Sequence, residues 1–199
     1  MYGNIKEEIP KDAPPPLGKY VTLTHYIDAN LLHCLLTGKS VTGILHFLNQ
    51  TPIDWFTKKQ GTVETATYGS EMIAARTAIE QIQDLRLTLR YLGVPIREHS
   101  YMFGDNKTVV NSAVQPFGKL HKRHIMLSFH RVREAIASKM VIFHHINGDI
   151  NPADILSKHW AYSQVWPILR LALFYRGDPY NSLLETDDTT QSTSTPTST

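Results

Sequence analysis

Four acidic residues occupy positions from which they could act together in chemistry. Asp28 follows an apolar run, Glu71 lies in the first turn of a long helical pattern, Asp105 follows the run YMFG, and Asp154 opens a later helix. Strand ends and helix starts tend to meet at one rim of an α/β sheet, where ligands bind. Four carboxylates gathered there would repel one another unless cations neutralised them. Such hard oxygen ligands suit Mg²⁺ or Mn²⁺, and two such ions can clamp the attacking water and the leaving oxygen of a phosphodiester.

Each of these residues taken alone has a simpler interpretation. An aspartate after a strand is usually a turn residue, which applies to Asp28 and Asp105. Asp154 alone is typical of an acid that stabilises a helix start, and Glu71 alone could be a first-turn glutamate without further role. The chemical interpretation depends on all four residues occurring in this order on this succession of elements.

The elements that must position these residues follow from the period of the apolar residues. The strands expected from β-branched and aromatic runs are 20–27, 41–48, 53–57, 100–103 and 140–146, with a hairpin turn at 49–52. Apolar residues at helical spacing predict helices over about 71–92, from 106, over 124–138, from 151, and over 161–175. Three hairpin-connected strands followed by alternating strands and helices predict an α/β fold. Its mixed five-stranded sheet has three antiparallel strands and then parallel strands, flanked by helices.

Composition favours one folded domain with polar ends. Residues 1–18 are rich in proline and charge and are expected to form a flexible linker, whereas 19–178 are expected to form the domain with a C-terminal helix. The Ser/Thr-rich residues 179–199 are expected to be a disordered tail. Cys34 is the only cysteine, which excludes an internal disulfide and a cysteine-rich zinc site. No segment has the length and apolarity of a membrane span or a signal peptide, so no membrane partner is expected.

Five segments, in order, resemble the ribonuclease H domain of copia-type retrotransposon Pol polyproteins. They lie at residues 40–72, 70–82, 103–112, 122–136 and 151–160, and the resemblance spans about 20–160. The Lys58-Lys59-Gln60 element and the ADILSK motif that contains Asp154 favour this branch over cellular ribonucleases H.

The resemblance implies a function and a site. Carried over by position, the catalytic, metal-binding residues are Asp28, Glu71, Asp105 and Asp154. The implied enzyme is a ribonuclease H, an endonuclease that uses two Mg²⁺ (or Mn²⁺) ions to hydrolyse the RNA strand of an RNA–DNA hybrid during reverse transcription. It would leave 5′-phosphate and 3′-hydroxyl ends. Its implied partners are the hybrid and an upstream reverse transcriptase domain of the same polyprotein, and its implied location is a cytoplasmic reverse-transcribing particle or the nucleus.

The chain departs from the family pattern at several positions. Asn30 stands where the family has a second aspartate after the first strand, and Met126 stands where it has an aspartate after His-Ile. The departures leave the four acids intact. Cellular ribonucleases H add a mobile histidine before the last aspartate, a place where this chain has His144 and His145; a strand-end histidine is the simpler interpretation of both.

Contacts to nucleic acid are expected from basic residues that are unevenly distributed. A stretch from 119 to 139 is rich in Lys, Arg and His and is expected to lie along phosphates in a salt-sensitive, sequence-independent way. The alternative is a solvated helix face. The predicted nucleic-acid-binding residues are Lys58, Lys59, Asn106, Lys122, Arg123, His124 and Arg131. For Asn106 the alternative is a helix cap.

Two other functions are compatible with the sequence. A catalytically inactive transposon fragment that binds RNA or RNA–DNA hybrid would keep the fold and the basic stretch while losing metal affinity. An integrase or resolvase of the same superfamily is disfavoured, because integrases have three acids in a different order and no early Glu that opens the first helix.

Overall fold

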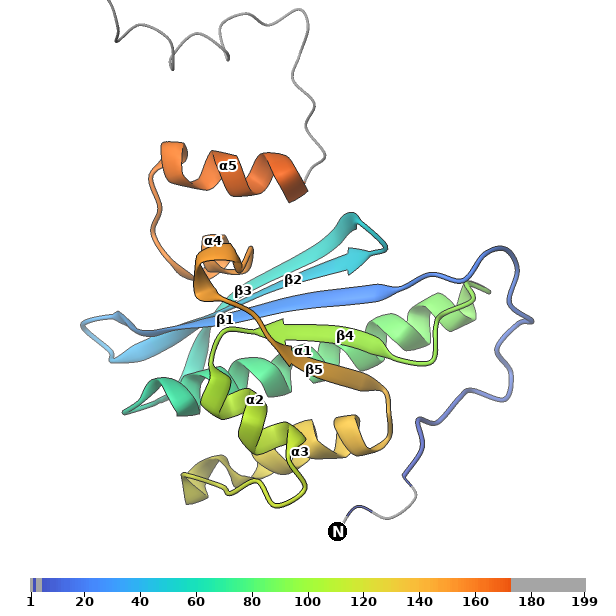
Figure 1. The fold of residues 1–199 in the computed structure, drawn as a ribbon, viewed down its shortest axis with the longest axis horizontal. Coiled ribbons are helices and arrows are strands. Elements are labelled where there is room, and N and C mark those ends of the chain that lie inside the picture. The colour runs from blue at the N-terminus through green and yellow to red at the C-terminus, as the bar shows by residue number, and fades with distance from the viewer. Residues whose placement is uncertain (1, 3–4, 173–199) are drawn as a thin grey trace, which may run out of the picture.

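The computed structural model describes residue 2 and residues 5–172. Its centre is a five-stranded mixed sheet, as predicted, and its strand order is β3-β2-β1-β4-β5 (Figure 1). The strands are β1 (Leu23–Cys34), β2 (Lys39–Leu48), β3 (Thr51–Val63), β4 (Ser100–Gly104) and β5 (Val141–His145). β1, β2 and β3 pair antiparallel, whereas β4 pairs parallel to β1, and β5 pairs parallel to β4.

The first strand is longer than its apolar run predicts. It was expected to end at Ile27, but it continues to Cys34 because its antiparallel pairing with β2 extends to Cys34 and Lys39. On its other side, the parallel pairing with β4 ends where Ile27 meets Gly104. Asp28 therefore lies inside a strand but just beyond the point where one neighbouring strand stops, which opens space beside it.

The third strand also exceeds its prediction of 53–57, because β2 pairs with it along its whole length. The predicted hairpin turn is confirmed, with Asn49 in the left-handed backbone region at φ 55°.

The long helix α1 (Thr67–Tyr91) covers one face of the sheet. Its start lies four residues before Glu71, which is consequently in the second turn and not the first. Apolar residues at helical spacing pack on Ile27, Ile44 and Met102 of the sheet and form the main core; these helix residues are Met72, Ala75, Ala78, Ile79 and Ile82. The helix ends before Gly93, whose φ of 72° favours glycine, as predicted.

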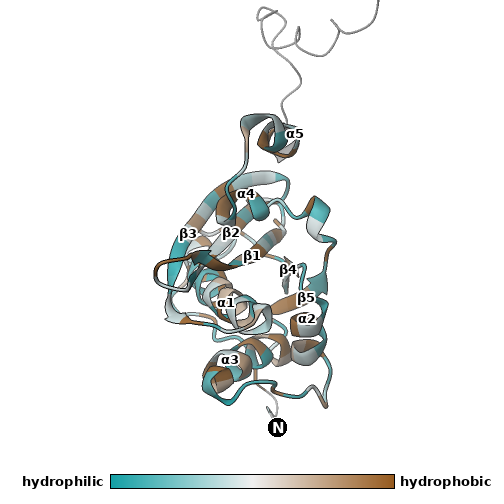
Figure 2. Cartoon of the chain, turned by 90° about the vertical axis from the view of Figure 1, so that its left-hand side faces the viewer, coloured by the Kyte–Doolittle hydropathy of each residue, from teal (hydrophilic) through white to brown (hydrophobic). Residues whose placement is uncertain are grey.

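Two further helices lie beyond α1 on the same side of the sheet. They are α2 (Lys107–Val114) and α3 (Met126–Ala137), and a single 3-10 turn, η1 (Arg123–Ile125), leads into α3. Figure 2 shows these layers at right angles to the first view, with α1, α2 and α3 on one side of the sheet and the last two helices on the other.

The opposite face carries two short elements that follow β5 and the 3-10 turn η2 (Gly148–Ile150). These are α4 (Asp154–Ser157) and α5 (Tyr162–Ala172). The helix expected from Asn151 begins only at Asp154, because the Asn151 side chain accepts a hydrogen bond from the Ala153 N–H and holds a preceding turn. No helix within residues 5–172 is long and apolar enough to cross a bilayer.

The N-terminal segment contacts the body through a buried ion pair. Glu7 binds the guanidinium of Arg86 at 2.8 Å and that of Arg90 at 2.6 Å, and the Arg86 side chain is 1% exposed. Burial opposes ionisation of Glu7, but the two arginines outweigh it and lower its pKa to about 2. The flexibility of residues 1–18 stays a prediction. The disordered tail and the domain boundary at 178 lie outside the described residues.

Candidate metal centre

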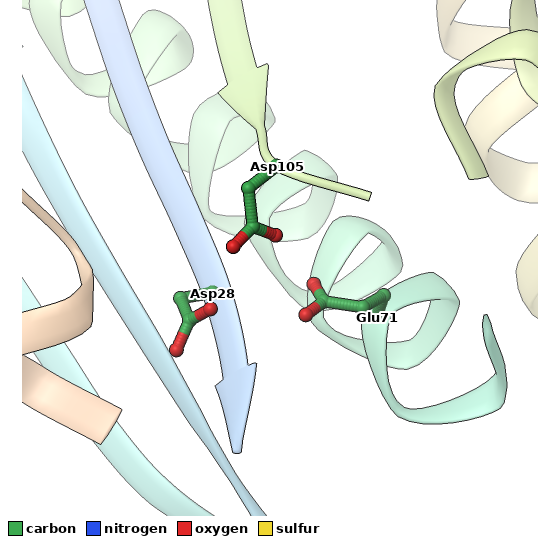
Figure 3. A group of neighbouring side chains, drawn as sticks. All are labelled: Asp28, Glu71 and Asp105. Atoms are coloured by element: carbon green, nitrogen blue, oxygen red, sulfur yellow. The ribbon is translucent and has the colours of Figure 1, made fainter. Parts of the chain in front are cut away.

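Three of the four predicted carboxylates converge at one end of the sheet. Asp28 comes from β1, Glu71 from α1, and Asp105 directly follows β4 (Figure 3). One carboxylate oxygen from each lies within 4.8 Å of the other two. The pairing of Ile27 with Gly104 places the next residue of each strand, Asp28 and Asp105, side by side. The backbone N–H of Ala29 donates to Glu71 Oε1 at 3.2 Å and ties the helix to the strand.

The environment of this cluster disfavours three adjacent negative charges. Burial, together with the charges of Asp28 and Asp105, raises the pKa of Glu71 well above its ordinary value. Burial also raises the pKa of Asp28 to about 6, with the charges of Asp154 and Asp105 adding to the effect. Burial and the charge of Asp154 also raise the pKa of Asp105. Burial and mutual repulsion therefore disfavour the ionised forms of these carboxylates, and a bound cation would offset both effects.

The fourth carboxylate, Asp154, lies beside the other three at the start of α4. The Lys158 ammonium contacts Asp154 Oδ2 at 2.6 Å and Asp28 Oδ1 at 3.9 Å, so it connects the two acids. The hydroxyl of Ser157 donates to Asp28 Oδ2. Residues 154, 157 and 158 belong to one turn of chain, and this turn therefore supplies an acid, a hydroxyl donor and a cation to the same place.

The turn is held against the sheet by contacts from three strands or their ends. Asn151, which is fully buried, donates to the Ile27 carbonyl at 2.9 Å, and Thr57 donates to the Leu156 carbonyl at 3.0 Å. Gly43 of β2 leaves no room for a side chain, since a Cβ there would lie 2.8 Å from the Ala153 carbonyl oxygen. The position of Asp154 depends on this close approach.

The donor set fits a hard divalent cation. All four acids offer oxygen only, and the cluster includes no thiol, which favours Mg²⁺ or Mn²⁺ over softer metals. Asp154 Oδ1 is buried and has no hydrogen-bond partner among the described residues. An orphaned buried carboxylate oxygen is costly unless a ligand satisfies it, so this atom marks a place for a cation.

The predicted nucleic-acid residues Lys58 and Lys59 lie close to this centre. They line a cavity of about 500 Å³ together with His33, Lys158 and His159. The cavity has one wall, at Ser157 and Lys158, in common with the carboxylate site. Positive charge thus adjoins the acids on the α4 side.

Three of the four residues predicted to bind nucleic acid in the stretch 119–139 have partners inside the protein. Lys122 and His124 both bind Glu64, whose side chain is 1% exposed, at 3.5 and 2.9 Å. Arg131 donates to Gln83 and to Glu134, whereas Arg123 is exposed. Sequence reasoning missed Glu64; its only signal was an acid close to the start of a long helix.

Asn106 and the two candidate histidines occupy the same end of the sheet. Asn106 caps α2, because its Oδ1 accepts from the N–H groups of Thr108 and Val109. His145 is exposed, and its Nε2 lies 3.0 Å from the Asp105 backbone oxygen. His144 is exposed and stacks with Phe103. Sequence reasoning also gave no role to Lys158 and Ser157, although both lie in the ADILSK motif.

The sequence is similar to retrotransposon polyproteins of plants. It is 27% identical over 136 residues (68% of this chain) to the retrovirus-related Pol polyprotein from transposon TNT 1-94 of Nicotiana tabacum. It is also 27% identical over 142 residues (71% of this chain) to the Pol polyprotein from transposon RE2 of Arabidopsis thaliana. These matches confirm the homology to copia-type Pol polyproteins that the motifs predicted. The aligned part is 10% of the length of each relative, and no family model matches the chain.

The fold is similar to that of ribonucleases H. LC11-RNase H1, solved in complex with an RNA/DNA hybrid, superposes with a TM-score of 0.54 at 16% identity, over 68% of this chain and 94% of that one. The N-terminal RNase H domain of rv2228c from Mycobacterium tuberculosis gives a TM-score of 0.52 at 12% identity, over 76% of this chain and 99% of that one. At these identities the similarity establishes the fold alone, and that fold is ribonuclease H-like, as predicted.

Proposed function

We propose that this domain is a metal-dependent ribonuclease H that hydrolyses the RNA strand of RNA–DNA hybrids during retrotransposon reverse transcription. The observation that carries the proposal is the convergence of Asp28, Glu71 and Asp105 within 4.8 Å. Asp154 lies beside them, in contact with the same lysine as Asp28. Carboxylates that approach so closely while buried are typical of sites that bind divalent ions and act on phosphate esters.

The chain's own residues would hold two divalent ions and orient the scissile phosphate. Asp28, Glu71 and Asp105 would offer their three neighbouring oxygens, and Asp154 would offer its unpartnered Oδ1. When bound, the ions would supply an activated water and neutralise charge that develops on the phosphate. The Ala29 N–H and the Ser157 hydroxyl fix the Glu71 and Asp28 carboxylates before any ligand binds. Such preorganisation lowers the reorganisation needed for reaction.

Recognition of the substrate would rest on phosphate contacts beside the site. Lys58 and Lys59 line the cavity that adjoins the carboxylates, and Arg123 is exposed, so all three are proposed to contact the backbone. Four further residues have partners inside the protein but remain candidates for contact with the nucleic-acid backbone through atoms that those partners do not occupy. They are Lys122, His124, Arg131 and Asn106. A hybrid as substrate is supported by LC11-RNase H1, which has the same fold and was solved with one.

The relatives suggest the setting in which the domain works. Because the aligned region is one tenth of a Pol polyprotein, the proposed partner is a reverse transcriptase domain of the same polyprotein. The corresponding location is the reverse-transcribing particle.

The test is cleavage of a short, end-labelled RNA–DNA hybrid by the full 199-residue chain, with Mg²⁺ or with EDTA. We expect cleavage of the RNA strand alone, dependence on Mg²⁺, and a loss of at least about a hundredfold in Asp105→Asn. Asp84→Asn, which alters an exposed acid on α1, serves as the matched control and should keep wild-type activity.

Cleavage that persists in Asp105→Asn would show that another protein or another site is responsible. Binding of the hybrid without metal-dependent cleavage would replace the proposal by the inactive binding fragment.

A further inference from the structure

The ammonium group of Lys158 lies among the carboxylates of the candidate metal centre. The Lys158 Nζ is 2.6 Å from Asp154 Oδ2 and 3.9 Å from Asp28 Oδ1. Its side chain is 36% exposed, whereas those of Asp28 and Asp154 are 2% and 9% exposed. The ammonium therefore reaches inward from a partly open position to two acids that are almost fully buried.

This ammonium acts electrostatically on the whole cluster. Its positive charge lowers the pKa of Asp28, Glu71 and Asp105, against the burial that raises them. A lysine ammonium is charged at neutral pH, and its contacts at 2.6 Å and 3.9 Å make Lys158 the counter-ion of Asp154 and Asp28 in the metal-free protein.

A divalent ion held by Asp28 and Asp154 would lie close to the Lys158 ammonium, which contacts the same two carboxylates. Two cations at contact distance from the same carboxylates repel each other, so the ion and the ammonium cannot both bind there at full strength. The unpartnered Asp154 Oδ1 does not remove the conflict, because the Lys158 ammonium still lies on the same carboxylate.

The structure also offers Lys158 another position. Its side chain also lines the cavity of about 500 Å³ beside α4 and β3, whose lining includes none of the four acids. The lysine side chain is long and flexible, so the ammonium can move into that space without movement of α4.

We infer that Lys158 is a built-in competitor of the divalent ion at the Asp28–Asp154 side of the site. It neutralises the acids in the metal-free protein and weakens binding of the second ion, which must displace it. The inference rests on the proposed function, since it concerns the same site, and it makes Lys158 a residue that sets the metal requirement.

The test measures metal binding without nucleic acid. The full chain and Lys158→Met are titrated with MnCl₂ at pH 7.5, with free Mn²⁺ followed by its paramagnetic resonance signal. We expect a dissociation constant about three- to tenfold lower for the weaker ion in Lys158→Met, from the removal of one competing charge. Lys158→Arg retains the charge and should stay close to wild type. Lys19→Met, an exposed lysine before β1, controls for the change in net charge.

A second readout is the stability of the metal-free protein in EDTA. Lys158→Met should unfold at lower temperature than wild type, and the stabilisation by added Mn²⁺ should be larger in the variant, because the ion takes over as counter-ion. Lys158→Gln provides the same comparison should the Met variant fail to fold.

Equal or weaker Mn²⁺ binding in both Lys158→Met and Lys158→Gln would overturn the inference and leave the proposed function intact. Absence of Mn²⁺ binding in the wild type, or binding unchanged in Asp28→Asn, would instead overturn the metal centre on which the proposed function depends.

Discussion

Basic residues that look alike in the sequence differ in what their side chains contact. Lys122 bonds to Thr65 and lies 3.5 Å from the buried Glu64, so its charge compensates an internal acid. Lys58 and Lys59 are exposed and line the cavity beside the carboxylates. At the scale of single residues, the second pair is the better candidate for contact with backbone phosphates.

This difference predicts separable effects of two substitutions. Lys58→Ala combined with Lys59→Ala should weaken hybrid binding and lower the slope of log affinity against log salt by about two, with little change in stability. Lys122→Ala should lower that slope less than the double variant does, and it should reduce the free energy of unfolding by about 1–2 kcal/mol, since it removes the ion pair with a buried acid. Fluorescence anisotropy at several salt concentrations and urea denaturation measure the two quantities. An unchanged salt slope in the double variant would remove Lys58 and Lys59 from the interface.

The element that decides the geometry of the site is one of the shortest. α4 has four residues, and a helix of this length is not stable without tertiary contacts. Its place is fixed by Asn151, by Thr57 and by the absence of a side chain at Gly43. Because Asp154, Ser157 and Lys158 all move with it, a small displacement of α4 alters three contacts of the cluster together.

Substitution of Gly43 tests that dependence at the scale of the element. In Gly43→Ala the new Cβ would lie 2.8 Å from the Ala153 oxygen and 3.0 Å from Leu156 Cβ, so α4 must shift outward. We expect cleavage to fall by about tenfold to a hundredfold, as for other sub-ångström to ångström misplacements of catalytic groups, while the protein stays folded. Circular dichroism and the hybrid cleavage assay measure the two properties.

Gly61→Ala on β3 is the matched control, since a Cβ there meets nothing within 4 Å. Full activity of Gly43→Ala would show that Asp154 does not depend on this contact between β2 and α4.

Across the whole molecule, the layer between the sheet and α1 contains polar groups as well as apolar ones. His25 and His46 share a hydrogen bond of 2.7 Å between their Nδ1 atoms, and His46 Nε2 lies 3.0 Å from Gln81 Oε1. Burial, with the neighbouring charges of His46 and Arg86, lowers the pKa of His25 well below its ordinary value. Burial also lowers the pKa of His46, although Gln81 and Asp54 oppose the shift.

The lowered pKa values of these two buried histidines predict that the fold loses stability at acid pH. Below the unfolded-state pKa of about 6.5 the unfolded chain binds protons that the folded chain cannot, so stability falls as pH decreases, by up to about 1.4 kcal/mol per pH unit for each histidine. The carboxylates of the metal centre have raised pKa values and act in the opposite direction. The histidine effect is therefore measured as a difference between variants.

In His46→Gln, the loss of stability relative to wild type should shrink as pH falls from 7.5 to 5.5, because the variant has one buried histidine fewer to protonate. Urea unfolding in EDTA at three pH values provides the measurement, and His99→Gln, which lies outside the buried layer, should show no such trend. A difference that stays constant with pH would mean that the pair titrates as it does in the unfolded chain.

The sequence alone determined the order of the elements and where each of them lies in the chain, although β1, β3 and the start of α1 extend beyond their predicted bounds and α4 starts later. Alternation and helical spacing are local properties, and they placed the five strands, the core face of α1 and the turn at Asn49. Glycine residues at the ends of elements also located the end of α1, at Gly93, and the end of β4, at Gly104. The order of four acids on these elements was enough to predict that they meet, since the rim of such a sheet gathers strand ends.

Only the tertiary structure decided which charged side chains pair with one another. The length of β1 beyond Asp28, the ion pair between Lys122 and Glu64 and the contact of Glu7 with Arg86 all depend on residues that lie far apart in the chain. The place of Lys158 among the acids depends on how α4 packs against Gly43. Sequence patterns report which face of an element is buried, whereas the partner of a buried charge is chosen by packing between elements.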